Sequence, residues 1–199
     1  MVNLSKGGSV VLSKGVKKFR IGISWDIVDG KEFDLDVLAI GLDNKTGGKA
    51  IDESHLVFYG SDLKTPDGKP RDPNSAIIHS GDNRTGAGEG DDEVITVDVS
   101  KLDPRVKCIV FVVNIYEGKM RGYNFGQVAG AAARLYEGDK TVPEIVFDMN
   151  EDMSDKTCLE FCQIYEHNGE WKFKALGDAN TNDLAQELQR YGIPCTGNA

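Results

Sequence analysis

The sequence contains no long hydrophobic run. Its longest uninterrupted apolar stretch, Cys108 to Val113, is far shorter than the roughly 18 residues that a membrane-spanning helix needs. No apolar segment typical of a secretory signal follows residues 1–6. These absences favour a soluble chain without membrane insertion, and we expect it in the cytoplasm.

Basic residues are also scarce. Lysine and arginine total 23 against 32 aspartate and glutamate, which gives a formal net charge of −9. A nucleic-acid binder needs a cationic face to neutralise phosphates, and no cluster of lysine and arginine occurs in the sequence. A nucleic-acid partner is therefore not expected.

Cysteine is rare as well, with four residues among 199, too few for a disulfide scaffold. Cys158, Cys162 and His167 have a spacing that suggests zinc, but a fourth ligand is missing and Cys162 lies in a predicted strand. Buried reduced thiols are the favoured interpretation.

Short segments rich in Val, Ile, Phe and Tyr, separated by frequent turn signals, make up most of the chain, as is typical of antiparallel all-β domains. The expected strands are 10–12, 19–25, 33–42, 54–59, 94–99, 108–116, 132–136 and 144–148. The run at 109–113 does not alternate, which predicts a central strand covered on both faces. We predict a mainly β protein, an antiparallel β-sandwich with a few short helices. The length favours a single domain over 1–193, followed by a short tail at 194–199.

The C-terminal part predicts a hairpin followed by a helix. Asn168-Gly169 favours a two-residue type I′ turn, which would pair Ile164 with Phe173 and Cys162 with Ala175. Leu184, Leu188 and Tyr191 then have helical spacing. This helix should pack across one sheet, with Thr181 or Asn182 as its cap and Gly192 as its end.

Two segments allow alternatives. The segment 126–133 is either a short helix or a close-packed connection, because it is rich in Gly and Ala. The segment 60–81 is longer than a simple connection needs, so it is either a mobile insertion or the wall of a site.

The strongest local signal is the acidic loop, Gly81 to Glu93, which carries five carboxylates and one arginine. Mutual repulsion and the glycine content oppose a fixed shape unless a cation compensates. An all-oxygen ligand set suits a hard cation, and calcium accepts six to eight flexible oxygen ligands more readily than magnesium. An EF-hand does not fit, since Arg84 would occupy a ligand position. The alternative is a flexible, solvated loop that binds no metal.

A second acidic pair, Asp34 and Asp36, lies in a predicted strand. Residues two apart on a strand share a face, so these carboxylates should point the same way, about 6.7 Å apart along the strand. Asp26, on the preceding strand, would join them if the connecting loop is long or bulged.

Together these residues resemble the TerD family of tellurium-resistance and stress-response proteins. The resemblance extends to about Gly192. Its motifs, in the order of the family, are Leu4-Ser5-Lys6-Gly7-Gly8, Trp25-Asp26, Phe33-Asp34-Leu35-Asp36, Thr65-Pro66-Asp67-Gly68, the acidic loop, Phe125-Gly126-Gln127-Val128 and Glu170-Trp171-Lys172-Phe173.

The resemblance implies a calcium-binding β-sandwich without established catalytic activity, and more than one ion is expected. Ala87, a short loop at 26–33 and a long segment at 69–78 depart from the family pattern and leave the ion count open. The grouping of ligands into individual ions is open too. The positions that match the family's oxygen-bearing residues are Asp26, Asp34, Asp36, Asp82, Asn83, Thr85, Glu89, Asp91, Asp92 and Glu93.

The function that this resemblance implies is calcium-dependent partner binding within a bacterial-type stress or tellurium-resistance system. Partners would be other proteins of such a system, membrane-associated ones among the candidates. One alternative is a divalent-metal-dependent phosphoester hydrolase, although no Lys, Arg or His constellation accompanies the acids. Another is a small-molecule or nucleotide-binding sandwich, with Arg84, Lys64 and Lys69 meeting an anion.

Overall fold

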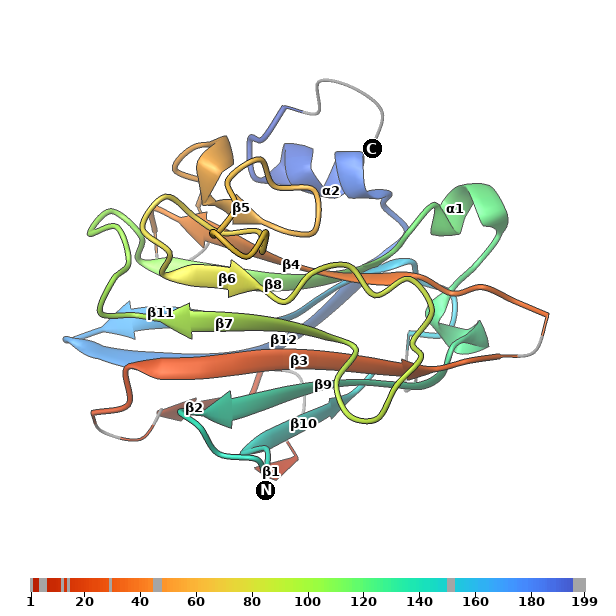
Figure 1. The fold of residues 1–199 in the computed structure, drawn as a ribbon, viewed down its shortest axis with the longest axis horizontal. Coiled ribbons are helices and arrows are strands. Elements are labelled where there is room, and N and C mark those ends of the chain that lie inside the picture. The colour runs from red at the N-terminus through yellow and green to blue at the C-terminus, as the bar shows by residue number, and fades with distance from the viewer. Residues whose placement is uncertain are drawn as a thin grey trace.

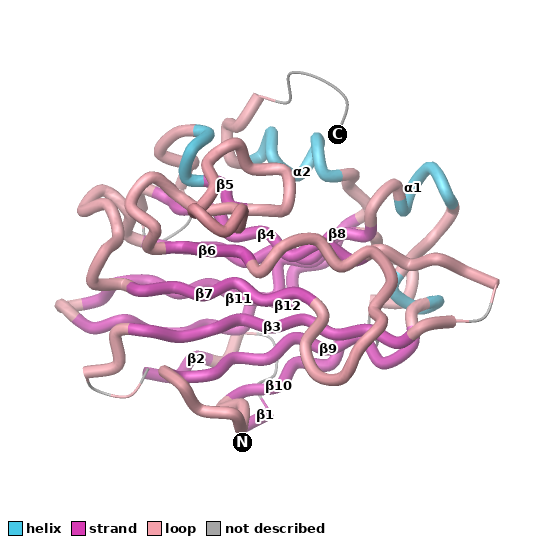
Figure 2. Tube along the Cα trace, viewed as in Figure 1, coloured by secondary structure: helices cyan, strands magenta, loops and turns pink. Residues whose placement is uncertain are grey.

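Two β-sheets packed face to face form the body of the protein, and short helices lie at its periphery (Figures 1 and 2). The computed structural model describes residues 2–3, 7–11, 13, 15–28, 30–44, 48–149 and 153–194. The family motif at 4–6 and the tail from 195 onward lie outside this description. The prediction of a mainly β sandwich is confirmed.

Within the described residues, each sheet has six strands. All neighbouring strands are antiparallel except β1 and β10, which are parallel. Sheet A has the order β1 (Val2–Asn3), β10 (Ile145–Asp148), β9 (Ala129–Glu137), β3 (Lys18–Asp26), β7 (Glu93–Asp98) and β6 (Ile77–His79). Sheet B has the order β2 (Ser9–Val11), β12 (Glu170–Asn180), β11 (Cys158–His167), β8 (Cys108–Ile115), β4 (Leu35–Leu42) and β5 (Leu56–Val57).

The helices are short: η1 (Glu53–His55), α1 (Gly118–Arg121), η2 (Phe125–Gln127) and α2 (Leu184–Arg190). None in the described part of the chain is long and apolar enough to cross a membrane. The predicted C-terminal helix is confirmed as α2, but the predicted cap is wrong. Asp183 caps the helix in a reciprocal capping box with Gln186.

Two further local predictions need correction. The expected strand at 54–59 begins as η1, because the Asp52 carboxylate accepts from the Ser54 amide and starts a helical turn. The segment 126–133 divides between η2 and the first residues of β9. Strand β6 was not predicted, since it is short and lies within a segment rich in Pro and Gly.

β8 is central in sheet B and buried along its whole length, as its non-alternating apolar sequence predicted. One face, with Ile109, Phe111 and Val113, packs between the sheets, and the other packs beneath α2. Two of the cysteines separate in the same way. Cys162 lies between the sheets and Cys158 in the cluster beneath α2, so they belong to opposite faces of β11.

The predicted hairpin between β11 and β12 is confirmed. Asn168 has a φ of 55° and Gly169 a φ of 78°, both in the left-handed region that a type I′ turn requires. Ile164 pairs with Phe173 and Cys162 with Ala175.

This turn yields a test of the fold. Asn168→Ala should lower the free energy of unfolding by about 1 kcal/mol, because alanine tolerates positive φ poorly, whereas Asn168→Gly should have little effect. In a domain of this size, 1 kcal/mol corresponds to a decrease in melting temperature of about 2–4 °C. Thermal unfolding followed by circular dichroism would measure both variants. Equal stability of the two variants would contradict the turn assignment.

Candidate metal centre

Three carboxylates converge where sheet B meets the loop between β6 and β7. Each of Asp34, Asp36 and Asp82 offers an oxygen, and the three oxygens lie within 4.8 Å of one another. Asp34 immediately precedes β4, Asp36 lies within it, and Asp82 belongs to the acidic loop. The structure therefore unites the predicted acidic pair with one residue of the loop.

Backbone hydrogen bonds hold the two strand acids in place. The Trp25 indole Nε1 donates to the Phe33 carbonyl at 3.0 Å, and the Tyr116 amide donates to the Asp34 carbonyl at 2.8 Å. Asp36 is only 2% exposed. These contacts fix the backbone near the start of β4, so the carboxylates cannot easily separate.

Burial and neighbouring carboxylates make Asp34 and Asp36 weaker acids than usual. Burial, followed by the nearby Glu93, Asp34 and Asp82 carboxylates, raises the pKa of Asp36 from 3.8 to about 9. Burial, together with Asp82 and Glu93, raises the pKa of Asp34 to about 6. Arg84 compensates weakly, because its Nε lies 3.9 Å from Asp34 Oδ2 and its side chain is 71% exposed.

A divalent ion fits this geometry. Oxygens bound to one calcium ion lie about 2.3–2.6 Å from it, so any two are at most about 5 Å apart, and the three carboxylates meet this limit. Asp34 Oδ1 is buried without a hydrogen-bond partner among the described residues. An ion would satisfy this oxygen, whose burial is otherwise unfavourable.

Asn83 and Asp92 shape the acidic loop. The Asp92 carboxylate accepts from the Trp25 amide and from Asn83 Nδ2, both at 3.0 Å. Asn83 Oδ1 in turn accepts from the Thr85 and Gly86 amides, each at 3.2 Å. These hydrogen bonds attach the loop to β3.

Asp91 lies on the outer face of sheet A. It forms an ion pair with Arg134 Nη1 at 2.8 Å, and its carboxylate covers Gly22, where a Cβ would clash with it. Arg134 also donates to Ser24 Oγ at 2.7 Å. Sequence reasoning missed Arg134, because only the register that pairs Gly22 with it reveals the contact.

Asp26 does not join the group at Asp34 and Asp36. β3 is irregular between Ser24 and Asp26 in its pairing with β9, and Asp26 ends in sheet A with its carboxylate against Gly130. The charges of Asp91 and Asp26 contribute to a raised pKa of Asp92, after the larger effect of burial. Asp26 and Asp91 therefore influence Asp92, but among the described residues only Asp34, Asp36 and Asp82 converge as three carboxylates.

The other predicted ligands have different environments. Thr85 and Glu89 are exposed residues of the loop. Glu93, the first residue of β7, is completely buried, and its oxygens accept from the backbone amides of Val37 and Asn83.

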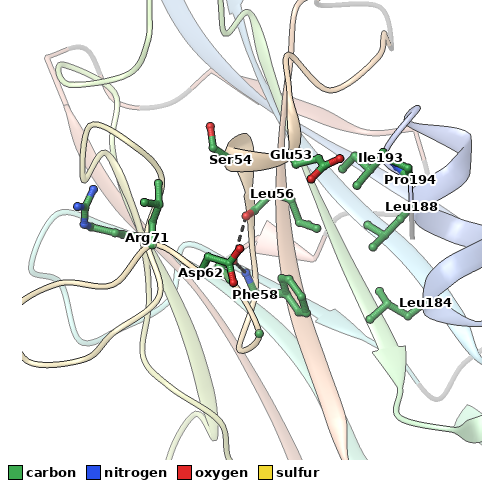
Figure 3. A pocket seen from close by; sticks show the side chains of 13 residues that line it. Glu53, Ser54, Leu56, Phe58, Asp62, Arg71, Leu184, Leu188, Ile193 and Pro194 are labelled. Atoms are coloured by element: carbon green, nitrogen blue, oxygen red, sulfur yellow. Dashed lines mark hydrogen bonds between the residues drawn. The ribbon is translucent and has the colours of Figure 1, made fainter. Parts of the chain in front are cut away.

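A separate cavity of about 470 Å³ lies between α2 and the segment 53–71. Leu184 and Leu188 project from α2 toward Phe58 on the opposite wall (Figure 3). Glu53, Asp62 and Arg71 also line the cavity. Part of the long segment 60–81 is therefore a pocket wall, and this pocket contains none of the three converging acids.

The pKa of Asp36 predicts the pH dependence of metal-free stability. Between pH 3.8 and about 9 the folded state keeps a proton that the unfolded state has released, so this group's stabilisation is lost as pH rises. In chelator at pH 8, Asp36→Asn should therefore be more stable than the wild type by more than about 1.4 kcal/mol, the equivalent of one pKa unit. The difference should vanish near pH 4. Denaturant unfolding at both pH values would measure it, and a pH-independent difference would contradict the assignment.

Comparison with known proteins identifies the family of the chain. The TerD domain model matches residues 1–191. Tellurium resistance protein TerD of Serratia marcescens is 40% identical over 197 residues, covering 96% of this chain and 97% of that protein. General stress protein 16U of Bacillus subtilis is 36% identical, covering 96% and 97%. The crystal structure of a homologue of telluride resistance protein TerD from Streptomyces coelicolor covers 87% of this chain and 96% of its own, with a TM-score of 0.68 and 21% identity. The chain belongs to the TerD family.

Proposed function

We propose that this protein is a calcium-binding, non-enzymatic module of a bacterial-type tellurium-resistance and stress-response system, and that it acts by calcium-dependent partner binding in the cytoplasm. The convergence of Asp34, Asp36 and Asp82, with an unpaired oxygen on Asp34, carries the proposal. The names of the relatives from Serratia marcescens and Bacillus subtilis support the physiological part.

Calcium suits the site better than magnesium. Magnesium requires near-ideal octahedral geometry and keeps several waters, whereas calcium accepts irregular sets of carboxylate and carbonyl oxygens. Asp34 and Asp36 lie at the start of a strand of sheet B, and Asp82 lies in a loop that follows a strand of sheet A. Ligands from such different elements form an irregular set. The expectation of more than one ion rests on the family resemblance alone, because among the described residues only Asp34, Asp36 and Asp82 bring three carboxylates within reach of one ion.

The ion would act by joining two parts of the sandwich. Asp36 lies in β4 of sheet B and Asp34 immediately precedes that strand, whereas Asp82 follows the edge strand of sheet A. Removing the repulsion among them stabilises the arrangement in which the acidic loop lies against β4. A partner that binds this ordered surface would then respond to calcium, because the ion shifts the population toward the binding-competent state. We expect that partner to be another stress or tellurium-resistance protein.

The hydrolase alternative finds little support around the three acids. Phosphoryl chemistry needs cationic groups at the developing charge. Arg84 is 71% exposed, and Arg121 is paired with Glu117. Turnover of phosphodiester substrates with manganese or magnesium would favour this alternative over the binding module.

The nucleotide-binding alternative is also weakly supported. Lys64 Nζ donates to the Tyr59 carbonyl and Lys69 pairs with Asp67. In the large cavity, the Arg71 guanidinium donates to three backbone carbonyls, while Glu53 and Asp62 would repel an anion.

Calcium titration by calorimetry tests the proposal. Asp82→Asn, which removes one ligand from an exposed position, should weaken calcium binding at least about tenfold, at roughly 1.4 kcal/mol per factor of ten. For the wild type, free calcium at about 100 times the dissociation constant should add roughly 2.7 kcal/mol to the free energy of unfolding.

The matched control is Asp67→Asn, which removes the same charge from an exposed loop outside the acidic group. It should leave calcium affinity unchanged. The same melting temperature for the wild type in chelator and in millimolar calcium would refute the proposed site. If Asp82→Asn and Asp67→Asn weaken calcium binding equally, the effect of Asp82 is a long-range effect of charge and not ligation.

A further inference from the structure

A buried histidine and glutamate lie behind the three-acid group. His79 ends β6 and Glu93 begins β7, and neither side chain is exposed to solvent. His79 Nε2 lies 3.3 Å from Glu93 Oε2. The Gly81 amide donates to His79 Nδ1 at 3.0 Å. Since Nδ1 accepts a hydrogen bond, the ring proton is on Nε2, facing the Glu93 carboxylate.

The Glu93 carboxylate reaches the amides that follow two of the acids. Oε2 accepts from the Val37 amide at 2.9 Å, and Oε1 accepts from the Asn83 amide at 3.3 Å. Val37 follows Asp36, and Asn83 follows Asp82. One buried side chain therefore connects the backbone of sheet B with the backbone of the acidic loop.

Asp82 is held on both sides by this pair. His79 binds the amide before it, at Gly81, and Glu93 binds the amide after it, at Asn83. The sequence suggested Glu93 as a metal ligand. Both of its carboxylate oxygens already accept hydrogen bonds, so Glu93 is better placed to orient the acids than to bind an ion.

We propose that His79 and Glu93 act as positioning residues that hold Asp82 and Asp36 at the separation required for one ion. This inference rests on the proposed calcium function. The Glu93 charge adds to the repulsion between the acids, but its hydrogen bonds oppose their separation. Moving Asp82 away from Asp36 would leave Glu93 buried with an unsatisfied oxygen. Outer hydrogen-bond partners of this kind orient ligands and change metal affinity without touching the metal.

Two substitutions separate the two contacts of the histidine, which are the hydrogen bond from the Gly81 amide to Nδ1 and the approach of Nε2 to Glu93 Oε2. Asn at position 79 retains an acceptor near Nδ1 but cannot reach Glu93, whereas Gln places a donor near Nε2 and loses the acceptor for Gly81. His79→Asn should lower calcium affinity about 10- to 100-fold. In metal-free protein, this variant should lose hydrogen-exchange protection at the Val37 and Asn83 amides while Gly81 stays protected. His79→Gln should show the reverse pattern of protection.

Ile77→Val is the matched control, because Ile77 is completely buried in the same strand and the change only removes packing. It should lower stability without changing calcium affinity. If His79→Asn folds, binds calcium like the wild type and keeps Val37 and Asn83 protected, the proposal is wrong. A loss of stability without a loss of affinity would make the pair a packing element only.

Calcium binding and amide protection can fail independently of each other. A wild type that binds no calcium would refute the calcium function, and the amide protection of Val37, Asn83 and Gly81 in metal-free variants would still decide whether the pair positions the loop. If His79→Asn does not fold, Glu93→Gln provides the second test. It retains one acceptor oxygen, so one of the Val37 and Asn83 amides should lose protection, and protection of both would overturn the proposal.

Discussion

Repulsion among three converging carboxylates, two of them buried, is the constraint on which the functional end of this sandwich depends. Folding brings one carboxylate oxygen each of Asp34, Asp36 and Asp82 within 4.8 Å of one another. Among the described residues, no lysine or arginine is buried beside them. The fold keeps them there through hydrogen bonds to the backbone, from the Trp25 indole and from the pair of His79 and Glu93. The arrangement is thus prepared for a cation that the protein itself does not supply.

The remaining acids show that residue type alone does not define a ligand. Asp92 holds the acidic loop on β3, and Asp91 pairs with Arg134 on the outer face of sheet A. Glu93 accepts hydrogen bonds from two backbone amides across the sandwich. Three consecutive acids therefore have three environments, because only Glu93 lies in β7 and the two residues before it do not continue the alternation of that strand.

Local patterns predicted much of this structure, and long-range pairing limited the rest. Alternation placed Asp34 and Asp36 on one face, the apolar run predicted β8 as central, and Asn168-Gly169 predicted the register of β11 and β12. No local signal indicates that Asp82 meets β4, since that contact depends on how the two sheets pack. Asp183 displaced the predicted helix caps because its capping box with Gln186 satisfies donors at both ends of the motif.

Hydrogen exchange with and without calcium tests most directly whether an ion orders the junction of the sheets. Calcium should protect the amides of the acidic loop and of the segment between β3 and β4, because both carry or support the ligand groups. The amides of β8 should change little, since that strand is buried on both faces independently of the ion. Protection confined to the junction would support the account. Calcium that protects the whole chain uniformly, or leaves the acidic loop unchanged, would contradict it.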